Sequence, residues 1–154
     1  MKLLKNASYL LFITLFLTSC DETDSQDSDL VGQWSWLTTV TTITESNGNM
    51  QTFTEIADVN NTWSVTLNDD NTFTEIRFQV DDYYPEGETE VGGGTWSINE
   101  GVLTIVIIDG DESDSFDLDY ILSNESNTLT MTQLIENEDS DQTVVAVFVF
   151  DRVE

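Results

Sequence analysis

The chain has 154 residues, enough for one domain with its own core, and it combines 30 acidic residues with four Lys or Arg and no histidine. Its net charge of −26 at pH 7 excludes a nucleic-acid-binding role, which requires a cationic surface. Without histidine, Ser-His and Cys-His catalysis are excluded and the commonest zinc ligand is absent, so we do not expect an enzyme.

The first twenty residues have the pattern of an export signal. Two lysines precede an apolar run that ends in the sequence LTSC at residues 17–20, and this run is too short to span a membrane. The pattern resembles the lipobox of bacterial lipoproteins, which implies cleavage after residues 1–19 and acylation of Cys20, the only cysteine. Two or more acyl chains anchor a protein stably. The alternatives are an ordinary signal peptide that leaves a free thiol, and a short N-terminal membrane anchor.

The next segment, residues 20–30, is rich in Asp and Ser and is expected to be a disordered acidic tether. In the lipoproteins that the chain resembles, an Asp directly after the cysteine is an inner-membrane retention signal in some Gram-negative bacteria. A longer acidic stretch is similar to a surface-export signal in others. The acids that continue to Asp29 favour the second, so we expect a lipid anchor in the outer membrane of the cell envelope, facing outward.

From residue 31 to residue 154 the pattern is β throughout, because Thr, Val, Ile and aromatic residues alternate with polar residues between turn clusters. Asn47-Gly48 is one such turn signal. A long loop is expected at residues 81–94, which contain the only proline and three consecutive glycines. The expected strands are residues 33–44, 50–56, 62–67, 72–80, 95–98, 102–108, 115–122, 128–135 and 142–151.

Short turns between consecutive strands predict an all-β fold, an antiparallel meander of 8–9 strands that closes into a barrel and so removes its edges. A barrel of about eight strands is either filled by side chains or holds one small ligand. The ninth segment is apolar on both faces, and it would be a strand split at a bend or an end strand that overlaps the closure. A two-sheet sandwich is the alternative.

Several short motifs occur in the order found in one family. The Gly32-Gln33-Trp34 sequence is similar to the Gly-x-Trp signature of lipocalin-like domains, and residues 69–73, 94–105 and 120–131 resemble the hairpins of lipocalin-like bacterial lipoproteins. The resemblance implies a barrel with a possible cavity, but it implies no particular ligand. It also implies that Gly32, Trp34 and Arg152 close one end, with the arginine packed over the indole. Alternatively, Arg152 only neutralises neighbouring acids.

Large aromatic residues are the candidates for a ligand site. If the interior is open, they would line a pocket for a small apolar or amphipathic ligand; otherwise they fill a compact core. In that second case residues 81–94, with Tyr83 and Tyr84, would make the protein a non-enzymatic interaction or structural component of the envelope. The six candidates are Trp36, Trp63, Phe78, Trp96, Phe116 and Tyr120.

One acidic turn has carboxylates that could bind calcium weakly, at Asp109, Asp111 and Asp114. The EF-hand pattern fails there, because Gly110 stands in second place and Tyr120 stands where the bidentate Glu belongs. With 30 acids in the chain, a solvated turn is the favoured interpretation, and we expect no metal or cofactor.

Overall fold

The computed structural model describes residues 28–110, 112–137 and 142–154, so the predicted signal peptide, Cys20 and most of the predicted tether lie outside the described residues. The described residues form nine strands. These are β1 (Gly32–Glu45), β2 (Met50–Ile56), β3 (Asn61–Leu67), β4 (Thr72–Gln79), β5 (Glu88–Asn99), β6 (Val102–Asp109), β7 (Glu112–Ser123), β8 (Thr128–Asn137) and β9 (Gln142–Arg152).

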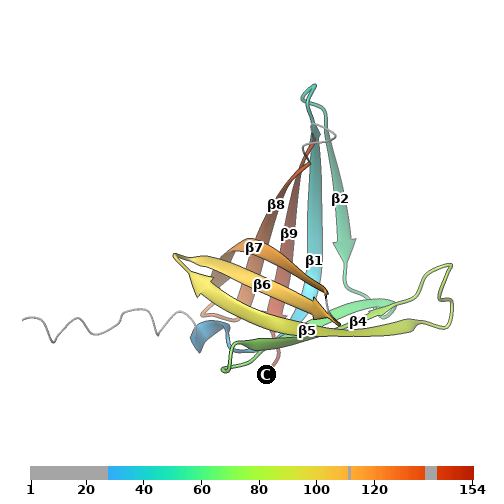
Figure 1. Cartoon of the computed structure of the whole chain (residues 1–154). Helices are drawn as coiled ribbons and strands as arrows, with labels where there is room; N and C mark the ends of the chain where they lie inside the picture. The colour runs from blue at the N-terminus through green and yellow to red at the C-terminus, as the bar shows by residue number, and fades with distance from the viewer. Residues whose placement is uncertain (1–27, 111, 138–141) are drawn as a thin grey trace, which may run out of the picture.

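The strands form one antiparallel sheet that closes on itself (Figure 1). Their order is β2-β1-β3-β4-β5-β6-β7-β8-β9, and β1 also pairs with β9. Eight strands therefore make a closed barrel, with β2 as an extra strand. The predicted all-β meander barrel is confirmed, and the two-sheet sandwich is excluded because the first and last strands pair.

The extra strand is β2, whereas the sequence pointed to the ninth segment. β9 is one continuous strand that pairs along its length with both β1 and β8, so the expected bend or overlap was wrong. The strand that divides its pairing is β1, which has 14 residues against seven in β3. Its first part pairs with β3 and its later part pairs with β2, and the register against β9 shifts between Trp36 and Thr38.

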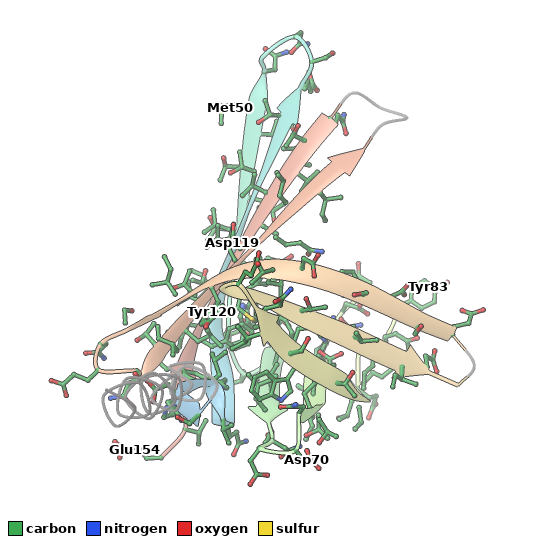
Figure 2. The ribbon with its side chains drawn as sticks, turned by 60° about the vertical axis from the view of Figure 1, so that its left-hand side comes forward. Met50, Asp70, Tyr83, Asp119, Tyr120 and Glu154 are labelled. Carbon is green, nitrogen blue, oxygen red and sulfur yellow. The ribbon has the colours of Figure 1, made fainter. Side chains whose placement is uncertain are left out.

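Beyond the barrel, four strands continue as a sheet that stands away from it (Figures 1 and 2). We call this sheet the blade; it consists of residues 50–56, 38–45, 142–149 and 133–137, in spatial order. It separates from the barrel because β7 pairs with β8 only from Asp119 to Ser123. Figure 2 shows Asp119 where the two parts meet and Met50 far out on the blade.

The fifth strand is longer than predicted, and the loop before it is shorter. β5 begins at Glu88, so the three glycines at residues 92–94 lie within a strand that pairs with β4. A Cβ at Gly94 would lie 1.9 Å from the Val106 carbonyl oxygen, so no other residue fits there. These glycines mark a close approach of chains, which sequence reasoning takes for a turn signal.

One end of the barrel is closed by a packed core. Trp34, Leu67, Leu103 and Phe150 are fully or almost fully buried there, and the Trp34 indole N–H donates to the Leu30 carbonyl oxygen at 2.9 Å. Leu30 itself is completely buried, so the folded domain begins before residue 31, where the sequence had placed its start.

Arg152 covers this closed end. Its guanidinium carbon lies 4.4 Å from the centroid of the Trp34 ring. Its donors go to the main-chain carbonyls of Ser126 (3.0 Å), Val31 (2.9 Å) and Asp29 rather than to carboxylates. Gly32 has a φ of +144°, and a Cβ there would lie 2.7 Å from Arg152 Nη1. The glycine thus provides both the backbone conformation and the space that the arginine requires.

Candidate ligand-binding cavity

The opposite end of the barrel contains a cavity of about 530 Å³. Because residues of the blade are part of its lining, the cavity reaches the side of the barrel where the blade diverges from β3 and β7. Its floor is the packed core around Trp34, Leu67 and Leu103, and polar residues such as Glu55 and Gln133 also line it. The interior is therefore filled at one end and hollow at the other.

Aromatic rings form much of the cavity wall. The Trp63 ring meets Phe150 at a centroid distance of 4.9 Å and Phe148 at 5.8 Å, both edge to face. The Trp36 indole N–H donates to Thr39 Oγ1 at 2.9 Å, so its polar atom is already hydrogen-bonded within the wall. Such walls favour burial of an apolar group.

A charged cluster projects into the same space from β4. Glu75 and Arg77 line the cavity, whereas Ile76, between them in sequence, is 49% exposed on the outside. Successive residues of a strand point to opposite faces, so β4 here has its polar face inward. This orientation is the reverse of the usual one for a half-buried strand.

One carboxylate oxygen holds the charged cluster together. Glu75 Oε2 accepts hydrogen bonds from Trp63 Nε1 (2.9 Å), Arg77 Nη2 (3.0 Å) and Arg77 Nε (3.2 Å). The Arg77 guanidinium also lies over the Trp63 ring, 4.4 Å from its centroid. These bonds satisfy the Glu75 carboxylate, which is the more buried partner of the pair, with the side chain 12% exposed against 47% for Arg77.

The cluster keeps hydrogen-bonding capacity for a ligand. The side chain of Glu75 is 12% exposed and that of Arg77 is 47% exposed. Among the described residues, neither Arg77 Nη1 nor Glu75 Oε1 has a hydrogen-bond partner. A donor and an acceptor on two cavity-lining residues therefore remain available to a ligand.

The structure brings four of the six predicted ligand residues to the cavity and leaves two outside it. Trp36, Trp63, Phe78 and Phe116 line it. The Phe78 ring also packs against Gly87, where a Cβ would lie 2.5 Å from it.

The other two predicted ligand residues, Trp96 and Tyr120, pack in the core. Trp96 is 3% exposed, and its indole N–H donates to the Asn68 carbonyl oxygen at 3.1 Å, which ties β5 to the turn between β3 and β4. Tyr120 packs against the core from β7, opposite Met131 of β8. Neither lines the cavity.

Sequence reasoning missed the charged residues of the cavity. Glu75 and Arg77 are two positions apart, so they share one face of a strand, and Arg77 is one of only two arginines in the chain. The rarity of arginine in so acidic a sequence was the one signal that could have drawn attention to Arg77. Phe148 and Phe150 were also missed as wall residues, because the ninth segment is apolar on both faces.

The loop at residues 80–87 carries the two tyrosines that the sequence singled out. Tyr83 is 86% exposed and its ring lies 6.0 Å from that of Tyr84, while Asp81 Oδ1 accepts both of their main-chain N–H groups. The negative charge of Glu88, followed by a hydrogen bond to it, raises the pKa of the Tyr84 hydroxyl. The loop thus exposes the Tyr83 side chain to solvent (Figure 2).

The acidic turn at residues 109–114 is described only in part. Asp109 ends β6 and Asp114 lies in β7, whereas Asp111 lies outside the described residues. Within residues 28–110, 112–137 and 142–154, no group of three His, Cys, Asp or Glu side chains could hold a metal ion. In the same part of the chain, no helix has the length and apolar character needed to cross a membrane.

Fold and cavity together define an eight-stranded antiparallel barrel that is closed at one end and open at an aromatic-lined other end. No protein-family model matches the chain. No curated protein is significantly similar to it. The lipocalin-like resemblance stays a prediction from the order of the sequence motifs.

Two solved structures are similar to this chain over part of their own length. One is a mutant of Transferrin Binding Protein B from Haemophilus parasuis Hp5, with a TM-score of 0.45 and 13% identity over 83% of this chain and 28% of that one. The other is isotype 1 of the same protein from serogroup B Neisseria meningitidis, with a TM-score of 0.46 and 11% identity over 82% and 27%. This chain thus spans less than a third of either. Similarity at this level says nothing about what the chain binds.

Proposed function

We propose that this protein is a non-enzymatic, lipid-anchored component of the cell envelope that binds a small amphipathic ligand in the barrel cavity. The observation that carries the proposal is the cavity of about 530 Å³ within the barrel. Small-molecule sites usually have about 300–1,000 Å³, whereas ordinary cores contain few voids larger than a water molecule.

The charged cluster favours an amphipathic ligand over a purely apolar one. An apolar molecule that covered Glu75 and Arg77 would remove water from both charges without replacing its hydrogen bonds. A ligand with one polar group can instead bond Arg77 Nη1 or Glu75 Oε1 while its apolar part contacts Trp63 and Phe148.

The direction of the chain supports an outward-facing cavity. Leu30, where the predicted tether meets the domain, is buried at the closed end, and the cavity lining extends toward the other end. The blade projects from that other end (Figure 1). About ten residues separate Leu30 from Cys20, a reach of at most about 35 Å. In our proposal the lipid anchor holds the closed end toward the outer membrane, so the cavity opens away from it.

The test has two parts. Native mass spectrometry of the domain purified from its own host should show a bound small molecule. The stripped domain should then bind the fluorescent amphiphile anilinonaphthalene sulfonate with one site. Replacement of a wall residue, Trp63→Ala, should weaken this binding, whereas Ile76→Ala on the outer face of the same sheet region should not. Absence of both the host molecule and probe binding would contradict the proposal.

A second candidate function is recognition of another envelope component through residues 80–87. The observation that favours it is the 86% exposure of Tyr83 on a loop that projects from the barrel. Tyr83→Ser should then reduce crosslinking of the lipidated protein to envelope partners on its host without changing binding of the amphiphile. Unchanged crosslinking would remove this candidate.

A further inference from the structure

The blade ends in a strand with a free edge. β2 pairs only with β1, through seven consecutive residue pairs from Thr38↔Ile56 to Thr44↔Met50, and every one of its residues is exposed. A free edge presents a row of unpaired N–H and C=O groups that can template another strand. This edge lies on the far side of the blade from β8, and no described strand pairs with it.

The pairing pattern identifies which main-chain groups are free. Ala57 N–H donates to the Leu37 carbonyl and Glu45 N–H donates to the Asn49 carbonyl, each at 2.9 Å. In an antiparallel pair, alternate residues bond the same neighbour, so the odd-numbered residues of β2 bond β1. The main-chain groups of Met50, Thr52, Thr54 and Ile56 therefore point to the open side.

The strand lacks the features that normally protect an edge. Its sequence, MQTFTEI, has no lysine and no proline, and its register against β1 is unbroken by a bulge. Proteins usually blunt edges with lysine, proline, bulges or a very short strand. In addition, Phe53 is 52% exposed on one face, and Met50 (67%) and Ile56 (69%) are exposed on the other.

Charge identifies the kind of partner. The described residues contain only two basic side chains, and both are engaged, Arg152 by carbonyl groups and Arg77 by Glu75. The blade itself carries Glu45 and Glu55. A second copy of the chain brings the same net charge of −26 and is repelled, whereas a basic segment is attracted.

We propose that β2 receives an extended, basic segment of a partner protein, which adds to the blade as a fifth strand. Strand addition of this kind derives affinity from main-chain hydrogen bonds and specificity from alternate side chains. On the face that adjoins the cavity, the added strand would meet Gln51, Phe53 and Glu55. Cross-strand pairing then favours an aliphatic or aromatic residue opposite Phe53 and Lys or Arg opposite Glu55.

The test is selection from a library of randomised seven-residue peptides with blocked ends, using the folded domain as bait. In the enriched peptides, Lys or Arg should alternate with β-branched or aromatic residues. Their binding should slow hydrogen exchange at the amides of Thr52 and Thr54, and it should weaken as salt is raised. No enrichment, enrichment of acidic peptides, or protection elsewhere than at β2 would overturn the proposal.

Two variants at one position separate edge docking from folding. Thr54→Pro removes an N–H that points to the open side and spares the bonds to β1, so it should weaken peptide binding about tenfold or more. Thr54→Val keeps the donor and should bind like the parent protein. Amphiphile binding in the cavity reports that both variants remain folded. Equal peptide binding by Thr54→Pro would contradict edge docking. A parent protein that dimerises through protected β2 amides would make the occupant a second copy and overturn the proposal.

Discussion

The two ends of the barrel use the same contact for different purposes. At the closed end Arg152 lies 4.4 Å from the Trp34 ring, and at the open end Arg77 lies 4.4 Å from the Trp63 ring. Arg152 directs its donors to the main-chain carbonyls of Ser126, Val31 and Asp29. Arg77 bonds one carboxylate oxygen and keeps donors free. Both arginines stack on an indole, so stacking does not tell a structural arginine from a ligand-binding one. The hydrogen-bond partners of the guanidinium do.

The largest effect on stability should come from replacing Arg152 at the closed end. Arg152→Met removes the cation over Trp34 and the hydrogen bonds to the main-chain carbonyls of Ser126, Val31 and Asp29. We expect the free energy of unfolding to fall by about 3 kcal/mol. Urea unfolding followed by tryptophan fluorescence measures this loss. Arg152→Lys should have an unfolding free energy between those of the parent protein and Arg152→Met, because it keeps the positive charge but loses the planar guanidinium group and its several donors. An unchanged midpoint for Arg152→Met would remove the distinction between the two ends.

A slightly smaller loss of stability is expected from replacing Gly32, which lies against Arg152. Gly32→Ala places a Cβ 2.7 Å from Arg152 Nη1 at a backbone φ of +144°. The cost should be about 2 kcal/mol of unfolding free energy, from backbone strain and displacement of the guanidinium. In a double-mutant cycle with Arg152→Met, the penalty of Gly32→Ala should shrink. If the two substitutions had additive effects, the requirement for glycine at residue 32 would not come from Arg152.

The open end should respond in binding rather than in stability. Arg77→Met should change the unfolding free energy by less than about 1 kcal/mol, since the side chain is 47% exposed and surface pairs contribute little. Its binding of anilinonaphthalene sulfonate should weaken about tenfold, because a charged hydrogen-bond donor is lost. Calorimetric titration measures this loss, and Arg152→Lys is the control for an indirect effect. The reverse result, a large stability loss with intact binding, would make Arg77 a structural residue.

The smallest effect concerns the turn between β3 and β4. Asp70 Oδ1 accepts hydrogen bonds from the hydroxyl (2.6 Å) and the main-chain N–H (3.0 Å) of Thr72, and these lower the pKa of the Asp70 carboxyl below its ordinary value. Any stability they contribute is present above the ordinary pKa and is lost as pH falls through the lowered one. Thr72→Val should raise the pKa of Asp70, as NMR titration can measure. An unmoved titration midpoint would show that the hydroxyl is not the cause.

Most of the fold was readable because alternation and turn residues are local signals. The predicted bounds of β2 are those observed, and those of β3 and β9 differ by one residue at one end. The division of β1 was not readable. Which of two neighbours pairs with the later half of a long strand depends on contacts between distant segments. The start of β5 was missed for a different reason, because glycines that allow close packing look like glycines that allow a turn.

The cavity was only partly predictable. Aromatic residues could be identified as interior, but which of them face a void depends on where the barrel stops being filled. Trp96 and Tyr120 belong to the packed part, whereas Trp63 and Phe116 belong to the hollow part. Glu75 and Arg77 were missed because the polar face of an alternating strand is normally taken to face solvent. Their inward orientation depends on the register against β3 and β5, in which Ile76 points outward.

The bulge between Trp36 and Thr38 has a further consequence for how this molecule can diversify. Ring closure depends on strand segments on the proximal side of that point, since only residues 32–35 of β1 pair with β3. Distal to it, the β1–β2 and β8–β9 hairpins are unconstrained by barrel tilt or stagger. Pairs of residues inserted opposite one another there would keep every side chain on its original face. Beyond Thr41, Glu55 and Gln133, which line the cavity, the projecting arm can therefore grow or shrink in two-residue increments. Descendants of this scaffold could vary their reach in this way while the cavity lining stays the same.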